Sequence, residues 1–102
     1  MNNTFGLSDS VLSSIVNAIA SVRNVSRAII YGSRAKGNYR DNSDIDITLE
    51  GKDLTITDLA ALDERLDDLL LPWQIDLSIR ARITNTALLD EIERWGKVVF
   101  ER

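Results

Sequence analysis

Residues 32 to 47 read GSRAKGNYRDNSDIDI, and they combine a glycine–serine turn, three basic side chains and two aspartates two positions apart. The apolar segment before Gly32 predicts a strand that ends at this turn. The chain of 102 residues is acidic overall, with 16 acidic and 12 basic residues and a net charge of −4. Two more carboxylates beside a polar turn therefore need a physical reason.

The two aspartates begin a segment with the periodicity of a strand. Residues 44–49 alternate between apolar side chains at 45, 47 and 49 and polar ones at 44, 46 and 48, which predicts one buried face. Asp44 and Asp46 then project from the same side, about 7 Å apart. Asp76 lies in a second alternating segment, 73–79. It joins the pair if the two strands are neighbours and bury their apolar faces in one layer.

Such a carboxylate cluster has an electrostatic cost that a cation relieves. Two like charges 7 Å apart repel by roughly 2 kcal/mol at an effective dielectric near 20. Carboxylate oxygens suit magnesium or manganese, whereas protonation of one carboxylate is the other route to relief. The chain has no cysteine and no histidine, which excludes thiol nucleophiles, imidazole bases and a Cys/His zinc site. The structural alternative is an ordinary strand with aspartates on its wet face.

The turn itself predicts a phosphate site. A strand that ends in Gly32–Ser33 and enters a helical turn exposes backbone N–H groups and a hydroxyl, which together bind phosphate. Ser33 is also the expected helix cap. A P-loop is excluded although Gly32 and Gly37 have its spacing, because Asn38 and Tyr39 stand where Lys and Ser or Thr are required.

The basic side chains near this turn are Arg34, Lys36 and Arg40. Each one alone is typical of a solvent-exposed charge. Together they can neutralise a polyphosphate or an acceptor. A phosphate-binding turn next to a metal-binding carboxylate pair describes a site for a metal–nucleoside triphosphate.

The remaining chain predicts helices and strands that alternate on one sheet, in the order αβ(α)βαβα(β). Helices are expected from Ser8 or Asp9 to about residue 24, from Thr55 or Thr57 to the single proline Pro72, and from Thr84 or Asn85 to Gly96, with a helical turn at 34–36. Strands are expected at 25–31, 44–49, 73–79 and, at an edge, 97–101.

Gly32-Ser33, ten intervening residues and Asp44-Ile45-Asp46 resemble the GS-x10-DxD signature of the DNA polymerase β-like nucleotidyltransferases. The GSRAKG and SDIDI segments are most similar to the minimal (MNT) branch. Asp76 in PWQIDLSI stands where that family has its third carboxylate. The resemblance covers roughly residues 10–100. It implies an α+β nucleotidyltransferase fold, with a small mixed β-sheet and helices packed on one face, as a single minimal nucleotidyltransferase domain over residues 1–102.

The resemblance also implies a metal-dependent nucleotidyltransferase that moves a nucleoside monophosphate, AMP from ATP, to a hydroxyl acceptor. The implied catalytic and metal-binding residues are Asp44, Asp46 and Asp76, which would hold two Mg²⁺ ions, with Mn²⁺ as an alternative. Asp76 would accept the proton of the attacking hydroxyl. The implied nucleotide contacts are Gly32, Ser33, Arg34 and Lys36.

MNT proteins are typically encoded beside a HEPN-domain protein and often serve as antitoxins, so the resemblance implies a HEPN partner with a tyrosine as acceptor. The alternative is a non-catalytic subunit that neutralises a partner by covering it. Trp73 and Trp95 are candidate anchors for such an interface, although core burial is the commoner fate of each. A small-molecule modifier such as an aminoglycoside nucleotidyltransferase is less favoured, because those relatives usually carry an extra helical domain.

Composition bounds the partners and the location. The acidic balance argues against broad binding of nucleic acid, although a local basic patch is compatible with it. No apolar run approaches the roughly 20 residues that span a bilayer, and Met1–Ser10 lacks the pattern of a secretion signal. We therefore expect a cytoplasmic protein without a membrane partner. The sequence leaves open whether it forms a homo- or hetero-oligomer.

Overall fold

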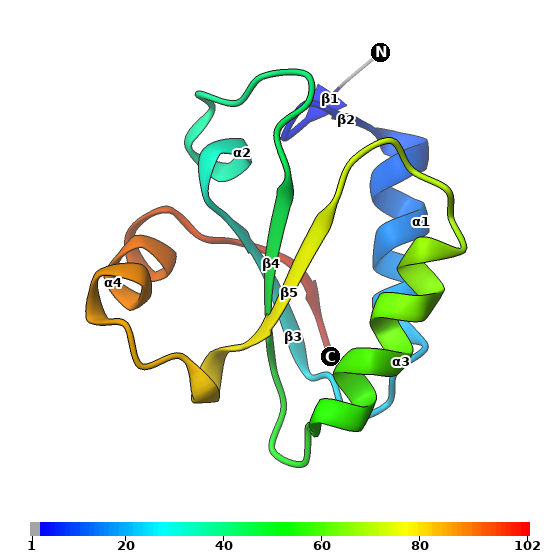
Figure 1. Cartoon of the computed structure of the whole chain (residues 1–102), viewed down its shortest axis with the longest axis vertical. Helices are drawn as coiled ribbons and strands as arrows, with labels where there is room; N and C mark the ends of the chain where they lie inside the picture. The colour runs from blue at the N-terminus through cyan, green and yellow to red at the C-terminus, as the bar shows by residue number, and fades with distance from the viewer. Residues whose placement is uncertain (1–2) are drawn as a thin grey trace.

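A computed structural model describes residues 3–102, and a four-stranded sheet lies at its centre (Figure 1). The strands are β3 (Arg27–Tyr31), β4 (Ile45–Glu50), β5 (Ile75–Ile79) and β6 (Lys97–Glu101). Their order across the sheet is β5-β4-β3-β6; β4 and β5 are parallel, and the other two pairs are antiparallel. The sheet is therefore mixed, as expected, and the elements that the sequence predicts occur in the predicted order.

Two helices cover one face of the sheet. They are α1 (Asp9–Ala20) and α3 (Ile56–Asp67), which lie side by side in Figure 1. Their apolar stripes, which include Ile15, Ile19, Leu62 and Leu66, pack on the sheet residues Ala28, Ile30, Ile45, Ile47 and Leu49. This layer is the main core. None of the helices in residues 3–102 is long and apolar enough to cross a bilayer.

The opposite face of the sheet carries α4 (Thr86–Trp95). Ile92 of this helix packs against Ile29 and Tyr31 of β3, which point away from α1 and α3. The expectation that the helices pack on one face is therefore wrong for α4, which Figure 1 shows on the other side of the sheet. The reason is that β3 is a central strand, apolar at four consecutive positions, and both of its faces need cover.

The helix starts follow the predicted caps at three places. The side chains of Ser8, Thr55 and Asn85 each accept a hydrogen bond from the backbone three residues on, at the starts of α1, α3 and α4. The short helix α2 (Ser33–Lys36) differs, because Gly32 and not Ser33 occupies its cap position. Gly37, with φ of 89°, ends it in the left-handed conformation.

A hairpin of two short strands, β1 (Asn3–Thr4) and β2 (Leu7–Ser8), precedes α1 and was not predicted. Strands of two residues have no readable periodicity, so the sequence offers little signal for them. The turn between them contains Phe5 and Gly6, both at positive φ. The helical segment Arg80–Arg82 after β5 is a second short element that the sequence pattern does not indicate.

Candidate active site

The strand register brings two of the three predicted carboxylates together. Asp46 of β4 lies opposite Asp76 of β5, and Tyr31 of β3 lies opposite Asp46 on the other side. Because Ile45 and Ile47 point into the main core, this row of three residues faces the side of the sheet that carries α4. The condition set by the sequence pattern, neighbouring strands with their apolar faces in one layer, is met.

The carboxyl of Asp46 is electrostatically the most perturbed group of the site. The pKa of Asp46 is raised to about 6, mainly by burial and in addition by the negative charges of Asp76 and Asp44. Among residues 3–102, no lysine or arginine forms an ion pair with any of these three carboxylates. The site therefore has an uncompensated negative charge.

Asp44 is placed differently from the other two. It is exposed and comes immediately before β4, at the end of the loop from α2. In the part of the chain that the structure describes, no three acidic side chains are gathered closely enough to form a metal site. The carboxylate oxygens of Asp46 and Asp76 are the kind of ligand that a hard divalent cation prefers.

Gly32 lies directly against this carboxylate pair. Its φ is 75°, and a Cβ atom built on it would overlap Oδ2 of Asp46. Any other residue would meet both backbone strain and a steric clash. Gly32 therefore allows the turn that begins α2 to approach the Asp46 carboxyl, and Ser33 follows at once in that turn.

Arg34 does not lie where the sequence analysis expected it. Its side chain is 2% exposed, and its guanidinium donates hydrogen bonds to the backbone carbonyls of Phe5, Asp41 and Ser43. Because the guanidinium is buried and donates to three backbone carbonyls, it is not positioned to bind a phosphate. The nucleotide contact expected of Arg34 is therefore corrected to an internal role.

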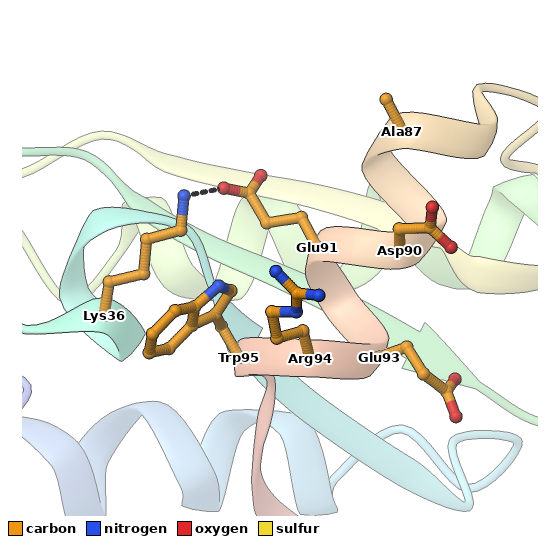
Figure 2. A pocket seen from close by; sticks show the side chains of 7 residues that line it. All are labelled: Lys36, Ala87, Asp90, Glu91, Glu93, Arg94 and Trp95. Carbon is orange, nitrogen blue, oxygen red and sulfur yellow. Dashed lines mark ion pairs between the residues drawn. The ribbon is translucent and has the colours of Figure 1, made fainter.

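Lys36 extends into a groove of about 630 Å³ between α2 and α4 (Figure 2). Its Nζ forms an ion pair with Glu91 of α4, marked by the dashed line in Figure 2. Trp95 lines the same groove and is 40% exposed, so it is not a core residue. The groove is lined by none of the three carboxylates.

A comparison with protein families identifies the family of this chain. Residues 13–102 match the model of the family described as Polymerase beta, Nucleotidyltransferase. The chain belongs to this nucleotidyltransferase family. No relative was found among curated proteins.

Solved structures share the nucleotidyltransferase fold at low sequence identity. A toxin–antitoxin structure with AMP-PNP has a TM-score of 0.73 and 22% identity, over 89% of this chain and 73% of that chain. An MNT antitoxin in complex with a tri-AMPylated Shewanella oneidensis HEPN toxin has a TM-score of 0.68 and 19% identity, over 91% and 71%. An MntA–HepT toxin–antitoxin has a TM-score of 0.69 and 20% identity, over 93% and 74%. At these identities the likeness establishes the fold alone.

The face of the sheet that carries Asp46 and Asp76 also carries polar residues that the sequence pattern did not single out. Ser78 donates to the hydroxyl of the fully buried Thr48 over 2.9 Å, in the layer next to Asp46 and Asp76. The pKa of Tyr31 is raised, first by burial and then by nearby acidic groups that include Asp46. Strand alternation could have identified Ser78 and Thr48, two positions after each aspartate. No local pattern indicates that α4 covers this face.

Proposed function

We propose that this chain is a metal-dependent nucleotidyltransferase that transfers AMP from ATP to a hydroxyl of a HEPN-domain partner and thereby acts as its antitoxin. One observation supports this most. Asp46 and Asp76 lie opposite each other on neighbouring strands, Asp46 lies against the Gly32 turn, and no basic side chain of the described residues pairs with either carboxylate.

The carboxylates are the cation-binding part of the proposed site. Asp46 and Asp76 would hold Mg²⁺ or Mn²⁺, with Asp44 completing the set for two ions. When bound, the cations offset the charge of the triphosphate and make the attacking hydroxyl more acidic. Cation binding would also relieve the repulsion that contributes to the raised pKa of Asp46.

The turn is the phosphate-binding part. Gly32 and Ser33 would receive the phosphates of ATP, through the backbone of the turn and the Ser33 hydroxyl. Lys36 follows on the same turn, and its ammonium would exchange the Glu91 carboxylate for a phosphate oxygen. Arg34 would contribute indirectly, because its guanidinium is bonded to backbone carbonyls.

The proposed reaction is an in-line transfer. The acceptor oxygen forms a bond to the α-phosphorus, the bond from that phosphorus to the bridging oxygen of the β-phosphate breaks, and pyrophosphate leaves. Asp76 takes the proton of the attacking hydroxyl. Its position supports this role, because Asp76 is exposed on β5, an edge strand that an external acceptor can approach.

The proposed acceptor is a tyrosine of a HEPN-domain protein. The support is the likeness to MNT antitoxins solved with HEPN toxins, one of them tri-AMPylated. The proposal is tested by incubating the chain with such a partner, Mg²⁺ and ATP labelled at either the α- or the γ-phosphate. The partner should become labelled from the α-phosphate alone.

Three variants sharpen that test. Asp46→Asn and Asp76→Asn should each lower the transfer rate by about 100-fold or more, whereas Asp63→Asn, an exposed aspartate on α3, should leave it unchanged. Transfer of γ-label, or full transfer by both site variants, would contradict the proposal.

A second candidate function is neutralisation by binding alone. The observation that favours it is the exposed Asp44, which leaves no assembled group of three acidic side chains within residues 3–102. The two functions differ in what Asp76→Asn does in cells that produce the partner. Loss of protection indicates transfer, and protection equal to that of the wild type indicates that binding suffices.

A further inference from the structure

We propose that Arg34 is a positioning residue that fixes the loop of residues 38–44, and with it Asp44, against the Gly32–Ser33 turn. The proposal rests on the proposed function, because it concerns how the two halves of that site are held together. Arg34 lies in α2, immediately after Ser33, and the loop leads from α2 to Asp44.

Two hydrogen bonds of Arg34 go to the peptide group between Ser43 and Asp44. Nε and Nη2 both donate to the carbonyl oxygen of Ser43, over 3.1 and 2.8 Å. That carbonyl belongs to the peptide bond between Ser43 and Asp44, so two bonds from one rigid fork orient this peptide plane. A longer contact of 3.4 Å joins Nη2 to the carbonyl of Asp41.

Aromatic side chains hold the guanidinium in place from two segments. Its central carbon lies 5.3 Å from the ring centroid of Tyr39 and 5.2 Å from that of Trp73. Trp73 also donates its Nε1–H to the carbonyl of Asp41 over 2.6 Å. The loop is therefore bound both to Arg34 and to the segment that leads into β5, the strand of Asp76.

The N-terminal hairpin completes the enclosure. Nη1 of Arg34 donates to the carbonyl of Phe5 over 2.8 Å, and Gly6 leaves no space for a Cβ beside the Tyr39 ring. Among the described residues, Arg34 forms no ion pair with a carboxylate. The buried guanidinium is therefore held by backbone carbonyls and aromatic rings, which connect the loop, the N-terminal hairpin and the segment before β5.

This geometry requires arginine. Three donor nitrogens in one plane span three carbonyls while the flat faces stack on rings, and the single ammonium of a lysine cannot do both. Arg34→Lys keeps the charge and removes the fork. Arg23→Lys is the control for the same change of side chain, because Arg23 is exposed and lies between α1 and β3, outside the loop.

The test measures the loop and the cation separately. In Arg34→Lys, amide hydrogen exchange in residues 38–44 should become about tenfold faster, with β3 and β4 unchanged. The affinity for Mn²⁺, measured by electron paramagnetic resonance with AMP-PNP present, should fall about tenfold, as for other changes behind a metal ligand. Arg23→Lys should match the wild type in both.

The outcomes are distinguishable. Unchanged loop exchange and Mn²⁺ affinity in Arg34→Lys overturn the proposal and leave the proposed function intact. A wild-type chain that binds no Mn²⁺ overturns the proposed function, and the exchange result still decides the role of Arg34. A uniform rise in exchange across the sheet contradicts a positioning role. If Arg34→Lys does not fold, Trp73→Phe replaces it, because that change keeps an aromatic ring beside Arg34, removes the hydrogen bond to Asp41 and should accelerate exchange in the same loop.

Discussion

The carboxyl of Asp46 shows the conflict between stability and function at a single residue. Its pKa of about 6 in the folded chain lies above 3.8, the usual value for an aspartate side chain. Between these pH values the folded chain binds more protons than the unfolded chain, so its free energy of unfolding falls as the pH rises. Above pH 6 the folded protein holds a charged carboxylate that it disfavours.

Asp46→Asn should remove this cost. Without divalent cations at pH 8, the variant should be more stable than the wild type by roughly 1 kcal/mol, a value reduced for solvent screening because Asp46 is partly exposed. The two proteins should converge near pH 4. Urea denaturation at both pH values measures this, with Asp63→Asn as the control. An Asn variant less stable at pH 8 would contradict the electrostatic account.

Substitutions at two glycines distinguish the cost of backbone strain from the cost of a steric clash. Gly32 and Gly37 both have positive φ, of 75° and 89°. A Cβ atom added to Gly32 would overlap the Asp46 side chain, whereas one added to Gly37 would meet no atom within 4 Å. Gly37→Ala should therefore cost about 1 kcal/mol, for the left-handed conformation, and Gly32→Ala about 1–3 kcal/mol more, for the overlap. Thermal denaturation compares them, and equal losses would mean that Asp46 moves aside freely.

At the scale of elements, charged side chains link α4 to the sheet. Arg80 donates to Glu50 of β4 over 2.6 Å and to Glu93 of α4 over 2.8 Å. Arg27 also binds Glu50, so loss of Arg80 leaves that carboxylate with a partner. The link connects the helix that carries Glu91 to the strand that carries Asp46.

Arg80→Gln should loosen α4 with a small effect on the whole fold. We expect a loss of roughly 0.5–1 kcal/mol, because these groups are partly exposed, and faster amide exchange in Thr86–Trp95 than in α1. The effect should shrink at about 1 M salt. Arg82→Gln, on the neighbouring exposed side chain, is the control. A difference that persists in high salt would assign the effect to packing.

At the scale of the whole molecule, the sequence predicts what depends on local periodicity. Alternation at 44–49 and 73–79 identified the two strands and the shared face of Asp46 and Asp76. It does so because successive side chains of a strand point to opposite faces in any sheet. The strand order and the face chosen by α4 depend on contacts between distant segments. The role of Arg34 is such a case, since its partners at Phe5, Ser43 and Trp73 meet only in the fold.

We propose that the Asp46–Asp76 pair and the Gly32–Ser33 turn together bind one nucleotide with its divalent cation. X-ray diffraction tests this directly. Crystals grown with Mn²⁺ and AMP-PNP should show an anomalous manganese peak in contact with both carboxylates, and the phosphates of the analogue at Ser33. A manganese peak away from both aspartates, or phosphates bound in the groove between α2 and α4, would contradict it.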